Sequence, residues 1–112
     1  MESQIIKDIE IKQIKEDNSK VRVIGKVISS DEKTGIFEIE DEGSKLTCMS
    51  MMGITPPKIG EMVIVTGRTV STDSSFELRI EAIQSININD YNNYKRYLKI
   101  RDDLLNNYGS RI

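Results

Sequence analysis

Few residues in this sequence have the types and spacing that catalysis requires. Glu38 and Glu40 are two carboxylates in the stretch IFEIE, and the alternation of an extended strand places both on one face. Paired carboxylates act as general acid and base when a pocket surrounds them, but this pair is expected to face solvent, because Phe37 and Ile39 take the opposite face. The sequence has no histidine, which excludes histidine-based catalysis and the usual Cys/His zinc sites. We therefore expect a protein that is not an enzyme and that uses no cofactor or metal.

The sulfur-containing residues support the same interpretation. Cys48 is the only cysteine, so the chain forms no internal disulfide, and we expect it to be a small buried hydrophobe. The run MSMM at residues 49–52 is expected to fill the core and its rim rather than to bind a partner or a metal. No apolar run is long enough to cross a membrane, and the start of the chain lacks the apolar segment of a signal peptide. These features predict an intracellular protein, in the cytoplasm and nucleoid or in the nucleus.

The elements that position these residues are mostly strands. Period-two alternation with β-branched residues predicts strands at residues 20–30, 36–40, 45–52, 62–70 and 76–86. Turn-forming residues separate the five stretches, and no helical pattern lies between them, which indicates a small barrel or sheet. A chain of 112 residues can build one such core. The prediction is an all-β fold with a terminal helix: a barrel over residues 1–88 and an interaction helix over residues 89–112.

Two of the predicted strands contain nearly the same six residues. VRVIGK at residues 21–26 and VIVTGR at residues 63–68 both read Val, any residue, Val, any residue, Gly and a basic residue. Glycine within a strand permits the bend or bulge with which a small barrel turns a corner. Because the similarity ends after six residues, we interpret it as two strands with one geometric task rather than as a duplication.

The arrangement of strands resembles a known family. The stretches VRVIGKVIS, IFEIEDEGSKLTC, KIGEMVIVTGRT and FELRIEAIQSI are similar to the five strands of an OB-fold, in the branch of the tRNA-anticodon and replication protein A domains. In that branch the first strand commonly reads V-x-V-x-G-x-V, and a glycine precedes the V-x-V-x-G of the fourth strand. The resemblance covers about residues 9–88 and implies a five-stranded Greek-key barrel. Fold alone does not assign a ligand.

The sequence departs from that family between the third and fourth strands. Many OB-folds place a helix there, whereas GITPPKIGE at residues 53–61 leaves room for little more than a turn. The N-terminal stretch IIKDIEIKQIKED is expected to replace this helix as a plug at the end of the barrel. The side chains predicted to pack there are Ile5, Ile6, Ile9 and Ile14.

The last segment has helical rather than strand character. It is expected to begin at an N-cap of Asn89 or Asp90 and to stop at Gly109. Apolar side chains recur at helical spacing and include all four tyrosines of the protein. This stripe either folds back on the barrel or docks onto a partner, and we favour docking, because a closed barrel offers no obvious apolar exterior. The predicted partner-binding residues are Tyr94, Tyr97, Leu98, Arg101, Leu104, Leu105 and Tyr108.

Charge argues against a barrel that grips nucleic acid strongly. The net charge is −4 over residues 1–89 and +2 over residues 90–112. OB-folds bind single strands on the face of their second and third strands, which here carries Glu38 and Glu40 and no aromatic ring for base stacking. The basic residues alternate along several strands and are not expected to cluster. The candidate nucleic-acid contacts are Arg22, Lys26, Lys33, Lys45, Arg68 and Arg79.

Three functional hypotheses remain open. The resemblance favours a non-enzymatic subunit of a single-stranded-DNA-binding complex, similar to the small subunits of replication protein A, which pair with partner subunits through one helix after the OB-fold. Its partners would then be a larger OB-fold subunit or further copies of itself, and DNA bound directly or through the complex. The first alternative is an independent OB module that binds single-stranded DNA or RNA. The second is a protein–protein adaptor unrelated to nucleic acid.

Overall fold

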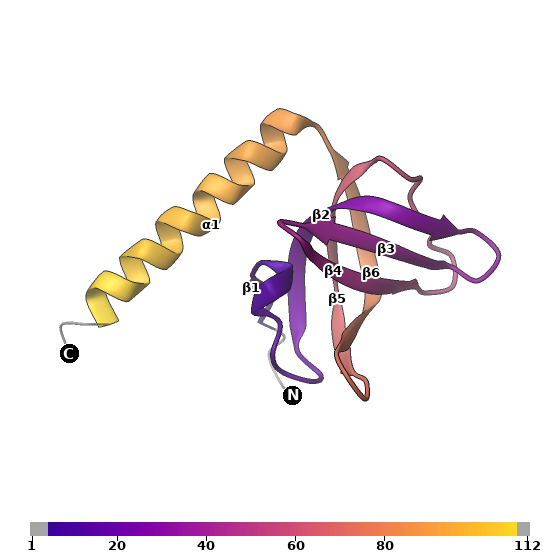
Figure 1. Cartoon of the computed structure of the whole chain (residues 1–112), viewed down its shortest axis with the longest axis horizontal. Helices are drawn as coiled ribbons and strands as arrows, with labels where there is room; N and C mark the ends of the chain where they lie inside the picture. Colours follow the sequence, from indigo (N-terminus) through magenta and orange to yellow (C-terminus); the bar gives the residue numbers. More distant parts are fainter. Residues whose placement is uncertain (1–4, 110–112) are drawn as a thin grey trace.

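The protein is described here from a computed structural model that covers the backbone of residues 5–109 and the side chains of residues 5–107. The five predicted strands are confirmed, each within two residues of its expected bounds. Within the described residues the strands are β1 (Lys7–Asp8), β2 (Lys20–Asp31), β3 (Ile36–Asp41), β4 (Ser44–Ser50), β5 (Met62–Ser71) and β6 (Phe76–Ile86). A short 3-10 helix η1 (Ile11–Gln13) lies before β2, and the helix α1 (Ile88–Gly109) follows β6 (Figure 1).

Strands β2 to β6 close into a barrel. β2 pairs antiparallel with β3 on one side and with β5 on the other, and the pairs β3–β4 and β5–β6 are antiparallel too. β4 and β6 run parallel and complete the ring. This mixed, closed order is that of the five-stranded Greek-key barrel of the OB-fold. The predicted fold class, an all-β barrel with a terminal helix, is confirmed.

The two Val-x-Val-x-Gly stretches are direct partners in the β2–β5 ladder. Residues 21–25 run antiparallel to residues 63–67, with Val23 opposite Val65 at the centre. Each glycine therefore lies opposite the first valine of the other stretch. The repeated pattern places a glycine opposite a valine at each end of the paired segment. The antiparallel pairing of the two stretches therefore explains why both have the same pattern.

The glycines of these stretches permit close contacts between backbones. The register of β5 and β6 shifts at Gly67, and a Cβ atom there would lie 2.0 Å from the carbonyl oxygen of Arg79. A Cβ atom at Gly25 would lie 3.1 Å from the carbonyl oxygen of Glu40. The expectation that a glycine marks a bulge is confirmed at Gly67, where no larger residue fits without moving β6.

The N-terminal segment closes part of the barrel, but not with all of the predicted side chains. Ile11 of η1 is buried in the core, and Ile9 and Ile14 pack against it. Ile5 and Ile6 are exposed, so their predicted role in the plug is wrong. Their part of the chain instead leads into β1, which pairs with β2 at the edge of the sheet. The remaining core residues are Val21, Val23, Val27, Phe37, Ile39, Leu46, Cys48, Val63, Val65, Leu78 and Ile80.

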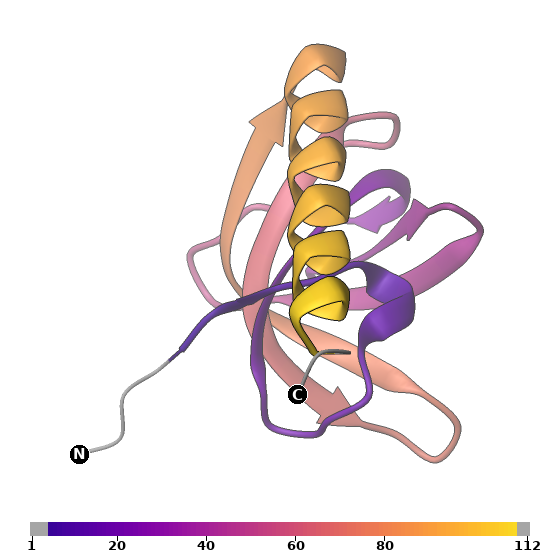
Figure 2. The same cartoon turned by 90° about the vertical axis from the view of Figure 1, so that its left-hand side faces the viewer.

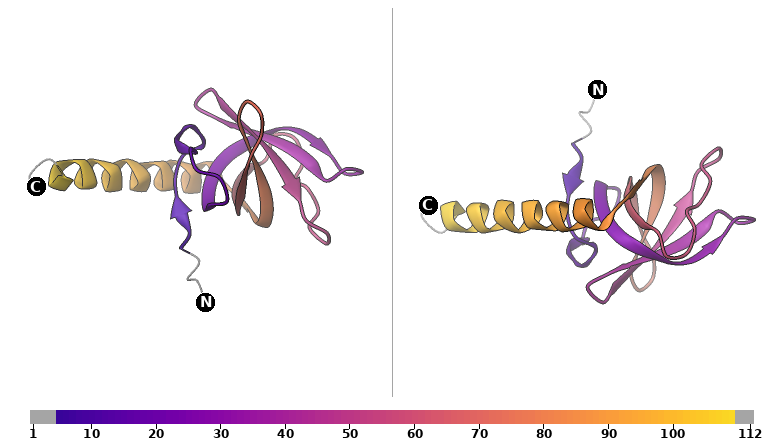
Figure 3. Two further views of the ribbon diagram at one scale, coloured as in Figure 1. Left: turned by 90° about the horizontal axis from the view of Figure 1, so that it is seen from below. Right: turned by 90° about the horizontal axis from the view of Figure 1, so that it is seen from above.

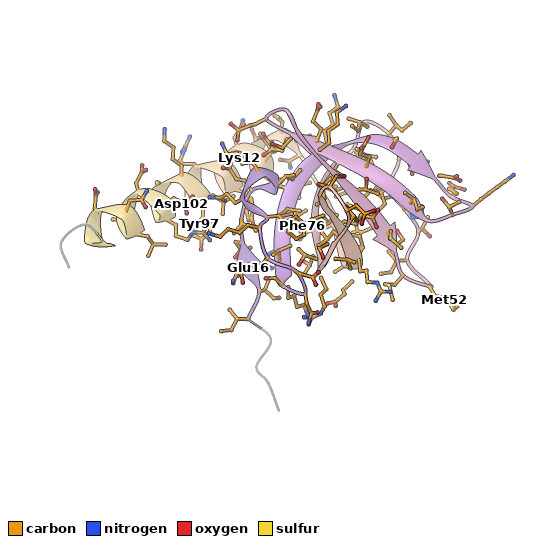
Figure 4. All side chains as sticks on the ribbon, turned by 60° about the horizontal axis from the view of Figure 1, so that its bottom comes forward. Lys12, Glu16, Met52, Phe76, Tyr97 and Asp102 are labelled. Carbon is orange, nitrogen blue, oxygen red and sulfur yellow. The ribbon has the colours of Figure 1, made fainter. Side chains whose placement is uncertain are left out.

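The sulfur-containing residues lie on opposite sides of the barrel wall. Cys48 is fully buried, as expected, and burial raises the pKa of its thiol. Met49, Met51 and Met52 are exposed, so the expectation that they fill the core is wrong. Met52 lies at the end of the molecule remote from α1 (Figure 4). Residues 51–61 contain turns and no helix, as predicted, and the amide of Gly60 donates to the carbonyl oxygen of Val27 over 2.9 Å.

Helix α1 begins earlier than predicted. The side-chain oxygen of Asn87 accepts a hydrogen bond from the amide of Asp90 over 2.8 Å, which makes Asn87 the N-cap rather than Asn89 or Asp90. The reason is that β6 ends at Ile86, so the first residue free of the strand is already the one that caps the helix. Neither helix of the described residues is long and apolar enough to span a bilayer.

The first half of α1 folds back on the outside of the barrel. Ile24 points outward from β2, yet it is fully buried, as is Leu98 of α1, and neither belongs to the interior cluster. The sequence predicts few apolar side chains on the outside of the barrel, with Ile24 among the exceptions, and the structure buries this side chain. Figure 2 shows α1 running along one side of the barrel beside the N-terminal segment. Both views of Figure 3 show its second half extending beyond the barrel, in a molecule 51 Å long.

Candidate partner-docking and nucleic-acid-binding surfaces

The contacts between α1 and the body of the protein are mainly polar. The ammonium of Lys95 lies among the carboxylates of Asp41, Glu10 and Glu42, with 2.5 Å from Nζ to Oδ2 of Asp41. The hydroxyl of Tyr91 donates to the other oxygen of Asp41, also over 2.5 Å. We call these five residues the Lys95 cluster. It connects the helix to the N-terminal segment and to the hairpin between β3 and β4.

Ionisation in the Lys95 cluster follows from these contacts. Burial alone would lower the pKa of Lys95, but hydrogen bonds to Asp41, Glu10 and Glu42 raise it above its ordinary value. The bond from Lys95 lowers the pKa of Glu42 to about 2. Burial and the bond to Asp41 raise the pKa of Tyr91 to about 12. Lys95 and Glu42 are therefore charged, and Tyr91 is neutral, at neutral pH.

A second group of polar contacts connects α1 to β1 and, through β1, to β2. Asp8 accepts from the hydroxyl of Tyr94 over 2.8 Å and from the guanidinium of Arg22 over 2.5 Å. Burial alone would raise the pKa of Asp8, but the bonds from Arg22 and Tyr94 hold it below its usual range. Arg22 is thus engaged within the protein, which makes it a poor candidate for the predicted contact with nucleic acid.

The predicted partner-binding stripe is divided between two environments. Tyr94 and Leu98 face the body of the protein, and Arg101 pairs with the neighbouring Asp102 over 3.1 Å while lying 6.0 Å from the ring centre of Tyr97. The exposed part of the stripe consists of Tyr97, Leu104 and Leu105, and it is joined by Ile100, an apolar residue that is not among the predicted partner-binding residues. The side chain of Tyr108 lies outside the described residues.

These exposed residues give the second half of α1 an apolar surface. Tyr97, Ile100, Leu104 and Leu105 each leave between 51% and 63% of their surface in solvent. Tyr97, Ile100 and Leu104 follow the i, i+3, i+7 spacing that puts side chains on one face. We call these four residues the docking end. Three large apolar side chains on one face of a projecting helix, with Leu105 on the neighbouring face, are typical of an interface.

Neither the acidic side chains near Lys95 nor the space beside them makes a ligand site. Carboxylate oxygens of Glu10, Asp41 and Glu42 lie within 4.8 Å of one another, as metal ligands would. The ammonium of Lys95 already lies between them, so the protein supplies its own cation. The adjoining groove of about 700 Å³ is lined entirely by charged side chains of both signs, whereas small-molecule sites are mostly apolar.

The face of β3 and β4 has the side chains that the sequence predicted. Phe37 is fully buried, which fixes the register and turns Glu38 and Glu40 outward. Glu38 lies opposite Thr47, and Glu40 lies opposite Lys45. No aromatic residue occupies the outward positions of these two described strands. The usual OB-fold face therefore lacks stacking platforms and carries two carboxylates at its centre.

Some of the predicted basic residues lie together, contrary to expectation. Arg68 of β5 is the cross-strand partner of Arg79 of β6 and of Lys20 of β2. We call Lys20, Arg68 and Arg79 the basic row. It continues onto Met49 of β4, the partner of Arg79. The sequence did not indicate Lys20 as a candidate, because its place beside Arg68 depends on the pairing of β2 with β5. An ion pair with Glu81 over 2.9 Å offsets part of the charge of Lys20.

The remaining basic candidates do not join this row. Lys26 and Lys45 both lie opposite Glu40, one on each neighbouring strand, so a carboxylate separates them. Lys33 is exposed in the loop between β2 and β3. The guanidinium of Arg68 donates to the carbonyl oxygen of Asn18 over 3.2 Å.

Comparison with known proteins supports the fold assignment. No protein-family model matches the sequence, and no curated protein sequence matches it. Among solved structures, the telomere capping protein Ten1 from Saccharomyces pombe is 24% identical with a TM-score of 0.70, over 88% of this chain and 99% of Ten1. A chain of the S. pombe Stn1–Ten1 complex is also 24% identical, with a TM-score of 0.71, over 91% of this chain and 96% of that one.

A more distant structure has the same architecture. A chain of a replication protein A heterotrimer bound to single-stranded DNA is 15% identical with a TM-score of 0.60, over 76% of this chain and 71% of that chain. At such identities the likeness is one of fold, and function needs separate arguments. The closed barrel, its strand order and these structural neighbours together identify the domain as an OB-fold.

Proposed function

We propose that this protein is a non-enzymatic OB-fold subunit of a complex that binds single-stranded DNA, inside the cell, and that it joins a larger OB-fold subunit through the docking end of α1. The observation that carries the proposal is the apolar end of the helix, Tyr97, Ile100, Leu104 and Leu105, exposed beyond the barrel. The likeness to Ten1 spans nearly the full length of both chains and supports it. So do the Stn1–Ten1 and replication protein A neighbours, which are themselves complexes.

The geometry favours this scaffold role over an independent nucleic-acid-binding module. The expected binding face presents Glu38 and Glu40 and no aromatic ring, so it repels phosphates and offers no stacking. The basic row gives a second, weaker possibility, because Lys20, Arg68 and Arg79 could contact a backbone that crosses β2, β5 and β6. In the proposed complex this row would add to DNA contacts made mainly by the larger subunit.

The test is purification of the tagged chain with its partners from the native cell. We expect the wild-type chain to bring a second OB-fold protein with it, and the purified complex to bind a labelled single-stranded oligonucleotide. The double variant Ile100→Asp/Leu104→Asp should lose the partner, because two charges would be buried in the interface. The matched control is Asn92→Asp/Asn106→Asp, which adds the same charges at exposed positions of the same helix.

Circular dichroism and light scattering complete this test. Both double variants should keep the melting temperature of the barrel, since all four positions are exposed. A native chain that is monomeric and brings no partner would contradict the proposal. So would a complex that does not bind single-stranded DNA, which would favour the adaptor hypothesis.

A further inference from the structure

We propose that the Lys95 cluster is a latch that fixes the direction in which α1 leaves the barrel, with Lys95 and Asp41 as the positioning residues. Asp41 is the last residue of β3, and its side chain is only 3% exposed. Both of its carboxylate oxygens accept hydrogen bonds from side chains of α1, one from Lys95 and one from Tyr91. The barrel thus holds a buried acceptor whose two partners both come from the helix.

Directional contacts are needed here because apolar packing under the helix is sparse. Among the described residues of α1, Leu98 is the only one that is fully buried. Burial of apolar surface stabilises contact but does not select an orientation, whereas hydrogen bonds weaken steeply away from linear geometry. The orientation of α1 therefore depends on its polar contacts. Among the described residues the Lys95 cluster supplies four of these hydrogen bonds, whereas Tyr94 donates one to Asp8 and Gln13 donates one to Asp102 over 3.4 Å.

Loss of the cation would do more than remove one bond. Without Lys95 the oxygens of Glu10, Asp41 and Glu42 would face one another within 4.8 Å, with no opposite charge between them. Like charges at that distance repel, and a buried carboxylate that loses its partner is strongly unfavourable. The hairpin, the N-terminal segment and the helix would separate to let water in.

The latch matters because the docking end lies far along α1 from Lys95, so a small rotation of the helix moves it a long way. Lys95 and Leu105 are ten residues apart, which corresponds to about 15 Å along an α-helix. A rotation of about 20° at Lys95 would displace the docking end by about 5 Å. An interface of packed side chains would not tolerate such a shift. This functional meaning rests on the docking role proposed above, whereas the latch itself can be tested without any partner.

The experiment measures the distance between two spin labels by pulsed electron paramagnetic resonance. Cysteines introduced by Ser29→Cys on β2 and Asn106→Cys on α1 are exposed positions, and the native Cys48 is buried and does not react. The wild-type chain should give one narrow distance distribution. Lys95→Met should broaden it or shift its mean by about 5 Å. Lys95→Arg, which keeps a cation, should restore most of the narrow component.

The matched control is Lys99→Met, the same substitution one turn later at an exposed position. It should leave the distribution unchanged, as should Ile100→Asp/Leu104→Asp, so failure of the latch and failure of partner docking are read separately. Thermal unfolding followed by circular dichroism reports the barrel. If Lys95→Met matches the Lys99→Met control, or if it unfolds the barrel together with the helix, the cluster is not a latch and the inference is overturned.

Discussion

At the scale of single residues, glycine and buried charge decide what this barrel accepts. The constraint at Gly67 does not come from an unusual backbone angle, since positive φ angles occur at other glycines of the described chain. It comes from β6, whose carbonyl group at Arg79 occupies the space where a Cβ atom would be. Gly25 has a milder version of the same constraint, with contacts near 3.1 Å.

We therefore expect Gly67→Ala to cost at least about 2 kcal/mol of unfolding free energy, because β6 must move away from β5. Gly25→Ala should cost less, about 1 kcal/mol, because its neighbours need to shift by only a few tenths of an ångström. Thr66→Val, an outward change on the same strand, serves as the control and should cost less than either. Urea unfolding of the three variants measures these differences. Equal midpoints for all three would show that the close approach of β6 does not limit the barrel.

At the scale of elements, the sequence predicted the strands better than it predicted what covers them. Alternation and turn residues define β2 to β6, because each strand buries one face against a single interior. β1 and η1 have no such signal, since two or three residues are too short for a period. The alternation of β2 predicts that Ile24 points outward, but nothing in β2 itself indicates that this side chain is buried.

The helix shows the same limit. Apolar spacing predicted α1, yet it placed Leu98, which is buried, in one stripe with Leu104, which is exposed. Which side of a helix meets its own domain is a tertiary property, and here it depends on Lys95 and Asp41, two charged residues 54 positions apart. The basic row was missed for a similar reason, because it exists only through the pairing of β2, β5 and β6.

The contact between α1 and the body of the protein should depend on pH through the ionisable groups that form it. The pKa values of Glu42 and Asp8 are lowered on folding, so their contribution is present above the unfolded values near 4 and is lost as the pH falls through the folded ones. The pKa values of Lys95 and Tyr91 are raised, so their contribution is complete below about pH 10 and is lost above it. The stability of the contact between α1 and the body of the protein should therefore be constant between about pH 5 and pH 9.

The label pair at positions 29 and 106, recorded across this pH range while circular dichroism confirms a folded barrel, measures the effect. The distance distribution should broaden below about pH 4 and stay narrow at neutral pH. In Lys95→Met most of the dependence on acid should disappear, because Glu42 has lost the partner that lowers its pKa. A change in the distance between pH 6 and pH 8 would contradict the assignment, since none of these groups titrates there.

At the scale of the whole molecule, the proposed function assigns different tasks to the barrel and to the helix. Met52 lies at the end of the molecule remote from α1, and Tyr97 of the docking end lies on the other side (Figure 4), whereas the hairpin between β3 and β4 contacts α1 through Asp41 and Glu42. This arrangement suits a subunit that is attached at one end and contributes little binding of its own.

Binding of nucleic acid by the isolated chain is the last prediction. Repulsion from Glu38 and Glu40 and the lack of stacking should limit its affinity for single strands to the micromolar range or weaker, on the order of non-specific binding. Three phosphate contacts at the basic row would give a slope of about −2 for log affinity against log salt concentration. Arg79→Gln should lower that slope by about 0.7, whereas Lys99→Gln on α1 should leave it unchanged. Fluorescence anisotropy with a labelled oligonucleotide at several salt concentrations measures both quantities. A nanomolar dissociation constant for the chain alone would reject the scaffold role in favour of an independent module, and Glu38→Lys would then show whether β3 and β4 form its binding face.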